Sequence, residues 1–288
     1  MASTPKQSKA NPIAYGLLLY WLAFAVYARP ILTLPSWSEL TLELSPALTV
    51  TADLKTTVAE RIQPSLIERP GALQPQETAY HLRVETHLKW FLSSKTWQGE
   101  LWLKPDLTAL QRTRFKRGPT SEYKIYRYAA RGVYRIRHQP QAQAGPLPET
   151  EHFYPFPENL PTCRIVSDPY AILLLLSQPD SIPDKICIFN KQGLYQISFQ
   201  LSGFEPVQVH YRQNVKPHRV QTQIQAQRVV IRPLPLEIGG DLEPFEFLGM
   251  EGEIAFLRDP KTHLPLQIEG QVPGFGRAKL QLTKVKLR

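Results

Sequence analysis

The sequence predicts a mainly β protein: one curved antiparallel sheet, half-barrel or barrel-like, with one or two short helices, preceded by an N-terminal apolar helix. Two observations carry this prediction. Apolar side chains recur at every second position over much of the chain, which is the pattern of a strand with one buried face. The chain also contains 27 prolines against 15 glycines, and proline disfavours the interior of helices and of central strands. Many short elements joined by turns are therefore expected.

The alternation begins near residue 40 and predicts about twelve strands. Leu40, Leu42 and Leu44 share one face of the first strand, and residues 48–54 repeat the pattern after Pro46. The later segments that alternate in the same way are 82–90, 97–117 with a turn at 104–106, 121–138 with a turn at 129–132, 185–201 with a hairpin connection at 190–193, 205–213, 218–233, 253–270 with a turn at 259–262, and 276–288.

One helix is expected among these strands, over Asp168–Ser177. Asp is a good N-cap, Pro169 is tolerated in a first helical turn, and Pro179 stops the helix. Because the segment is apolar on nearly every side, we expect it to be buried against the sheet or to cross it.

Residues 35–288 are predicted to form a single antiparallel β domain. An all-β domain can use roughly 200–250 residues, and the strand pattern is alike before and after residues 139–161. That stretch is rich in Pro, Gln, Ala and Glu, so we expect a long surface loop there.

Residues 1–34 form a separate segment that we interpret as a signal peptide or a signal anchor. Residues 1–11 are polar and basic, and residues 13–28 then run IAYGLLLYWLAFAVYA without a charge. This order is typical of export signals, and small residues at Ala25 and Ala28 provide two cleavage patterns. The apolar stretch is short for a membrane span, which needs about 20 residues. Cleavage and retention therefore both stay open, beside a third interpretation as a buried core helix.

Lys6 and Lys9 place the N-terminus in the cytoplasm under either export interpretation. The following domain is then expected in the periplasm, either soluble after cleavage or tethered to the inner membrane by a single N-terminal helix.

The net charge of +9 does not indicate a nucleic-acid-binding protein. Basic residues alternate with apolar ones, as Arg277 and Lys279 do with Ala278 and Leu280, which is typical of the solvated face of a strand. A nucleic-acid groove needs a concentrated basic patch with stacking aromatic residues. Attraction to an anionic membrane surface remains a second interpretation.

The two cysteines, Cys163 and Cys187, are candidates for a disulfide. An exported domain permits that bond, and a loop of this size would contribute roughly 3 kcal/mol in the chain-entropy model. The alternative is a pair of buried thiols.

Four segments occur in an order that resembles one protein family. They are WQGELWLKPDLTALQRTRFKRG, the helix at Asp168–Ser177, ICIFNKQGLYQISFQLSGFEPVQVHYR and EIAFLRDPKTHLPLQIEGQVPGFGRAKLQL. Together they look like the Domain of Unknown Function 3108 family of bacterial envelope proteins, over roughly residues 40–288. The most specific part is the D-x-x-x-x-L-P-L turn from Asp259 to Leu266. The resemblance implies an exported, curved antiparallel sheet similar to lipoprotein carriers, with no known reaction and no agreed catalytic residues.

No catalytic, cofactor or metal motif stands out. G-x-S-x-G, H-E-x-x-H and phosphate-loop patterns are missing from the sequence. His81 and His87 share a strand face but are separated by roughly 20 Å, too far for one metal. Whether His210, His218 and His263 meet in the fold stays open.

Two further clusters have a functional and a structural interpretation. The carboxylates Asp241, Glu243, Glu246, Glu251 and Glu253 form either a solvated loop or a site for acid catalysis or calcium. Six aromatic residues on neighbouring strands form either ordinary packing or the lining of an apolar groove for an acyl chain. They are Trp90, Trp97, Trp102, Tyr123, Tyr126 and Tyr134.

The preferred functional hypothesis is a non-enzymatic periplasmic or cell-envelope protein that binds or carries a lipid or another hydrophobic envelope component. No cofactor is expected. The alternatives are an accessory protein held beside an envelope protein partner by the N-terminal helix, and an envelope hydrolase.

Overall fold

The computed structural model divides the chain into two units, Met1–Ile31 and Leu32–Arg288. All the residues it describes belong to the second unit: 33–44, 48–58, 78–90, 93–117, 121–138, 149–157, 165–178, 182–214, 218–236 and 243–288. The predicted N-terminal helix therefore lies outside the described residues.

The described residues form one large sheet, so the mainly β prediction is confirmed. Antiparallel pairing dominates it, and every strand pairs with at least one other. The strands are β1 (Trp37–Leu44), β2 (Leu48–Val58), β3 (Thr78–Trp90), β4 (Ser93–Leu103), β5 (Ala109–Arg117), β6 (Glu122–Ala129), β7 (Gly132–His138), β8 (Glu149–Pro155), β9 (Val166–Ser167), β10 (Lys185–Asn190), β11 (Gly193–Gln213), β12 (His218–Leu236), β13 (Glu246–Phe247), β14 (Met250–Arg258), β15 (Pro265–Val272) and β16 (Gly276–Leu287).

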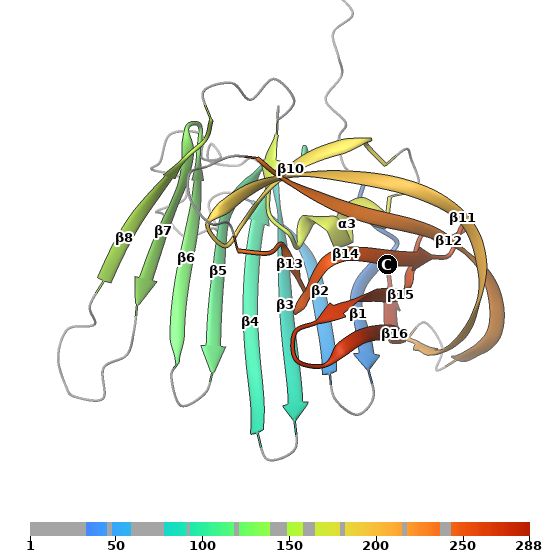
Figure 1. Ribbon diagram of the computed structural model, residues 1–288. Coiled ribbons are helices and arrows are strands. Elements are labelled where there is room, and N and C mark those ends of the chain that lie inside the picture. The colour runs from blue at the N-terminus through green and yellow to red at the C-terminus, as the bar shows by residue number, and fades with distance from the viewer. Residues whose placement is uncertain are drawn as a thin grey trace, which may run out of the picture. The chain divides into compact units, whose positions relative to one another are not determined.

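The sheet combines a closed part and an open part. Strands β1 to β8 lie side by side in chain order. On its other side β1 pairs with β16, and the sheet continues from β16 through β15, β14, β12, β11 and β10 to β9. The end of β11 also pairs with β16, where Arg212 lies opposite Lys284, so β11, β12, β14, β15 and β16 form a closed circuit. We call strands β3–β8 the wing; they fan out from the centre to the left of Figure 1, while β11 and β12 arch across on the right.

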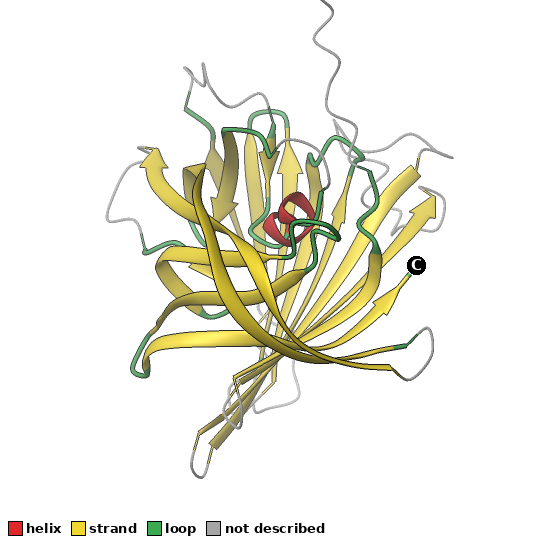
Figure 2. Cartoon of the chain, turned by 90° about the vertical axis from the view of Figure 1, so that its right-hand side faces the viewer, coloured by secondary structure: helices red, strands yellow, loops and turns green. Residues whose placement is uncertain are grey.

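The single described helix, α3 (Ala171–Leu176), lies inside the curve of the sheet (Figures 1 and 2). All six of its side chains are buried in the main core, together with inward residues of β1, β2 and β3 such as Leu42, Val50 and Leu82. The prediction of a buried apolar helix is therefore confirmed, although the helix is shorter than Asp168–Ser177. Pro169 and Tyr170 form a turn ahead of it.

Side chains from distant strands hold both ends of this helix. Before it, the carboxylate of Asp168 accepts hydrogen bonds from the Tyr170 backbone N–H, at 3.0 Å, and from Arg112, at 3.2 Å. After it, Arg258 donates to the carbonyl oxygens of Leu176 and Gln178. Each helix end thus finds partners within the core, where water cannot supply them.

The structure corrects two expectations about strand number. Residues 139–161, predicted as one long loop, contain the edge strand β8, whose Tyr154 packs against Phe189 of β10 at a ring separation of 5.5 Å. The segments 185–201 and 205–213 contribute to a single 21-residue strand, β11, with a register shift between Leu201 and Phe204. In both places pairing with a neighbouring strand, β7 for β8 and β12 for β11, forms strand structure that the local alternation did not predict.

Among the residues that the structure describes, we find no helix with the length and apolar character needed to cross a membrane.

Candidate functional site

The wing carries a row of cations on the face that is turned toward α3. Arg112, Arg114 and Lys116 occupy every second position of β5, and the register places Arg112 beside the buried Leu101 of β4. Alternation therefore puts all three cations on the inner side. Across β6 and β7 the same side carries Lys124, Arg135 and Arg137. We call these six cations the inner basic face.

Arg112 is the most buried of the six. Its side chain is 9% exposed and forms an ion pair of 3.2 Å with Asp168, which is fully buried. The guanidinium also lies 4.6 Å from the ring centre of Tyr170, a cation–π contact. Burial alone would lower the pKa of Arg112, but the Asp168 carboxylate raises it well above its ordinary value. The cation is therefore permanent.

Tyr128 completes the cluster around Asp168. Its hydroxyl donates a hydrogen bond of 2.8 Å to the same carboxylate oxygen that Arg112 contacts. Burial, together with the Asp168 charge, holds the pKa of Tyr128 well above its usual range, so this hydroxyl stays a donor.

A small pocket opens beside Arg112. It has a volume of about 50 Å³, and its lining includes Arg112, Arg114, Trp97, Tyr170 and Glu246. Among the described residues, Arg112 Nε is buried without a hydrogen-bond partner. A buried donor without an acceptor is costly, on the order of 1–3 kcal/mol. The pocket is thus lined by a permanently charged guanidinium that has one N–H without an acceptor among the described residues.

Internal carboxylates neutralise part of the inner basic face. Glu246 lies 3.5 Å from Arg114, and Glu122 lies near Lys124 and Arg137, at 3.0 Å and 2.5 Å. Burial would raise the pKa of Glu246, but Arg114 and Lys191 together lower it below its ordinary value. With Asp168, three carboxylates face six cations, so the surface keeps a positive excess.

The structure does not bring the six predicted groove aromatics onto one face. The strand registers place Trp97 and Tyr126 on the inner face of the wing, the side that carries Arg112. The same registers place Trp102, Tyr123 and Tyr134 on the opposite, outer face. Trp102 stacks on His81 with ring centres 4.7 Å apart. For Trp90 only the strand position is described, so its side chain is not placed.

The histidines and the acidic residues form no common centre in the described residues. His81 lies 3.5 Å from Glu100, and His87 lies 3.2 Å from Glu85. No group of three or more metal-ligating side chains gathers in the described part of the chain.

The acidic residues pair with cations instead of with one another. Glu243, Glu246 and Glu251 all approach Lys191 Nζ, at 3.3, 3.2 and 3.4 Å. Asp241 lies outside the described residues.

Cys187 is buried in β10, opposite Val166 of the parallel strand β9. Its predicted partner, Cys163, lies outside the described residues, so the disulfide stays a prediction.

Sequence reasoning missed the inner basic face because cations that alternate along a strand are typical of a solvated face. A signal was present at residues 112, 114 and 116, where three cations recur at a spacing of two. Nothing local shows that this side of β5 faces the helix; that follows only from the pairing of Arg112 with Leu101 and its contact with Asp168.

Comparisons with known proteins give a structural neighbour and no family. The chain matches no protein-family model, and no curated protein matches it. A solved structure of a β-barrel-like protein of domain of unknown function DUF1849, from Brucella abortus, aligns with 90% of this chain and 99% of its own, at 9% identity and a TM-score of 0.43.

Proposed function

We propose that this chain is a non-enzymatic binding protein of the bacterial envelope, which holds a lipid or another hydrophobic envelope component by an acidic group in the pocket beside Arg112. The observation that carries the proposal is the buried Arg112 guanidinium, which lines a pocket and has one N–H without an acceptor among the described residues. The planar guanidinium group of arginine binds phosphate and carboxylate oxygens through two parallel, charge-assisted hydrogen bonds.

The size of the pocket limits which part of a ligand it can hold. A volume of about 50 Å³ exceeds the roughly 10–15 Å³ of cavity that holds one water, but it is too small for an acyl chain. The side chains of α3 and the surrounding strands fill the core beside it. An acidic headgroup is therefore the part that enters, and the inner basic face attracts it.

The envelope location of this proposal rests on the sequence of residues 1–34 and on the resemblance to the Domain of Unknown Function 3108 family. A basic leader followed by an uncharged apolar stretch directs export. Fractionation of cells that produce the C-terminally tagged chain tests this part, and N-terminal sequencing of the purified product decides between cleavage and anchoring. A full-length product in the cytosol would contradict the location.

Binding is tested by titrating the protein with dihexanoyl phosphatidic acid, a short-chain lipid with an acidic headgroup, and with dihexanoyl phosphatidylcholine. We expect the phosphatidic acid to bind more tightly and to change the fluorescence of Trp97, which lines the pocket. Arg114→Gln should weaken binding roughly tenfold or more, because a hydrogen bond to a charged group contributes about 1.5–3 kcal/mol. Arg114 suits the test because its side chain is 24% exposed.

Arg83→Gln is the matched control, since Arg83 lies on the outer face of β3 opposite Glu100. It should leave the affinity unchanged. Equal affinity for both lipids, or equal effects of the two variants, would show that the pocket does not bind an acidic headgroup.

A further inference from the structure

A second and larger hollow lies over β14, β15 and β16, and it shares no lining residue with the pocket beside Arg112. Its volume is about 530 Å³, and its lining includes Arg228, Glu251, Glu253, Glu269 and Arg277. Cations and carboxylates thus line the same space.

A bulge in β14 borders this hollow. Glu251 pairs with Gln271 and Ala255 pairs with Glu269, so residues 252–254 stand against the single residue Gly270. Gly252 makes the bend with φ +75°, a conformation that favours glycine. A bulge leaves its extra residues outside the ladder, and two of them here, Gly252 and Glu253, line the hollow.

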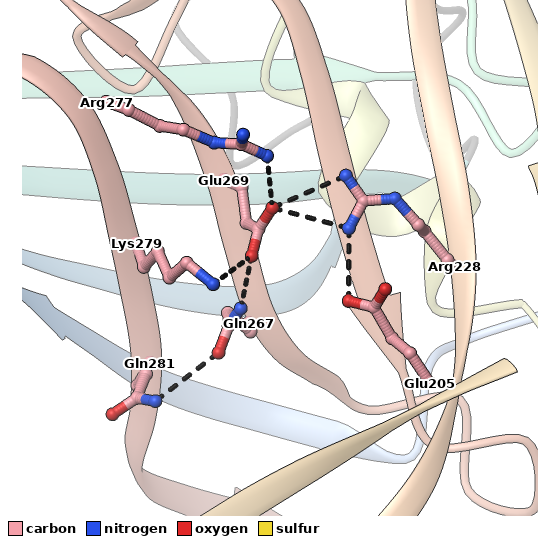
Figure 3. A network of polar contacts seen from close by, with 7 residues as sticks. All are labelled: Glu205, Arg228, Gln267, Glu269, Arg277, Lys279 and Gln281. Carbon is pink, nitrogen blue, oxygen red and sulfur yellow. Dashed lines mark hydrogen bonds and ion pairs between the residues drawn. The ribbon is translucent and has the colours of Figure 1, made fainter.

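The carboxylate of Glu269, which lines the hollow, gathers three cations around it (Figure 3). Lys279 approaches Oε1 at 2.8 Å, while Arg277 and Arg228 approach Oε2 at 3.0 and 3.3 Å. Gln267 donates a further hydrogen bond to Oε1 at 2.7 Å. Glu269 itself is 4% exposed, so it holds like charges together that would otherwise repel one another.

The three cations retain unused donors. Arg277 and Lys279 are 68% and 58% exposed, and within the described part of the chain each contacts a single carboxylate, that of Glu269. A guanidinium has five N–H donors and an ammonium has three. Arg228 shares its charge with a second carboxylate, Glu205, at 3.1 Å. Three cations against two carboxylates leave a positive excess around Glu269, and two of these cations, Arg228 and Arg277, line the hollow.

The bulge side of the hollow has the opposite character. Glu251 and Glu253 lie at 29% and 59% exposure, and among the described residues each has a single cation partner, Lys191 and Arg232. Their carboxylate oxygens keep free lone pairs next to the backbone of the bulge. A ligand that fills the hollow therefore meets hydrogen-bond donors at one end and acceptors at the other.

We propose that this hollow binds a small zwitterion, with an acid group at Arg277 and Arg228, which both line it, and an ammonium group at Glu253 in the β14 bulge. A purely anionic ligand would meet Glu251 and Glu253, and a purely cationic ligand would meet the arginines. Only a ligand with both charges matches both walls. Phosphoethanolamine has this chemistry, whether free or as a phospholipid headgroup.

Isothermal titration with O-phosphoethanolamine tests the proposal, with inorganic phosphate and ethanolamine as its two halves. The zwitterion should bind at least tenfold more tightly than either half. Arg277→Gln should weaken binding of the zwitterion and of phosphate, whereas Glu253→Gln should weaken binding of the zwitterion and of ethanolamine alone. Lys284→Gln, an exposed cation of the same strand β16, is the control and should change nothing.

Two results would overturn the inference: affinity for the zwitterion no greater than for its halves, or variants that alter the melting temperature while leaving binding unchanged. The second result would mean that the Glu269 network serves only to tie β12, β15 and β16 together. Flotation with phosphatidylethanolamine vesicles, against phosphatidylcholine vesicles, distinguishes a membrane headgroup from a free ligand. Because Arg114→Gln leaves this hollow intact, failure here and failure of the pocket beside Arg112 can be told apart.

Discussion

Arg258 Nη1 donates a hydrogen bond of 3.0 Å to the carbonyl oxygen of Leu176, although 82 positions separate the two residues in the sequence. The same nitrogen reaches the carbonyl of Gln178, and Nε reaches the side chain of Gln227. One cation of β14 thus satisfies the end of the only helix described in the structure.

Arg258→Met should therefore destabilise the protein by about 1–3 kcal/mol, because it leaves the carbonyls of Leu176 and Gln178 buried without donors. Urea unfolding followed by circular dichroism measures the change. Arg219→Met, at an exposed position of β12, should cost far less. An equal loss in both variants would mean that Arg258 does not support the helix end.

Glu269 should make the stability depend on acid pH. Burial would raise the pKa of Glu269, but Lys279, Arg277 and Arg228 lower it from 4.5 to about 2. A carboxyl group whose pKa is lower in the folded state stabilises the protein above its unfolded pKa, and this contribution is lost as the pH falls through the folded value.

The difference in unfolding free energy between the native protein and Glu269→Gln should thus be full at about pH 6 and shrink between about pH 4.5 and pH 2. Melting curves across this range measure it. Glu151→Gln, at an exposed position of β8, provides the comparison. A difference that stays constant down to about pH 2 would contradict the role of these ion pairs.

Gly99 is required by the ring of Tyr170. A Cβ atom at position 99 would lie 2.5 Å from Tyr170 Cε2, and Arg112 stacks against the same ring. Gly99→Ala should cost roughly 1–3 kcal/mol, as overpacking does.

When Tyr170→Leu is combined with Gly99→Ala, the double variant should recover part of the stability that Gly99→Ala alone loses. Tyr170→Leu removes the ring that the new methyl group at position 99 would meet. A double-mutant cycle measured by urea unfolding gives the coupling. Additive effects of the two substitutions would show that the contact between positions 99 and 170 is not the cause.

The candidate disulfide has a simple chemical test. Cys163 lies three positions before Val166 in the sequence. Val166 of β9 lies opposite Cys187 of β10. Alkylation of the unfolded protein before and after reduction should reveal two thiols only after reduction. Reduction should also lower the stability by about 3 kcal/mol in the chain-entropy model. Two reactive thiols without reductant would contradict the bond.

Much of the β structure could be predicted because its signals are local. Leu40, Leu42, Val50 and Ala52 are all buried, as their period-two pattern predicts. The turn at 190–193 and the apolar run that becomes α3 also depend on neighbouring residues only. The edge strand β8 escaped prediction because Tyr154, the one buried side chain among those described in it, packs against residues of other strands, Phe189 of β10 and Arg135 of β7.

The sequence by itself therefore determined where most of the strands and the buried helix occur, since alternation and turn chemistry act over a few residues. Only the tertiary structure decided which polar face of β5 is turned toward α3, because Gln111 and Thr113 on one side are as polar as Arg112 and Arg114 on the other. Pairing between the ends of the chain, β1 with β16, and the reach of Arg258 to α3 depend on contacts between distant residues. No local pattern encodes such contacts, and both proposed sites depend on them.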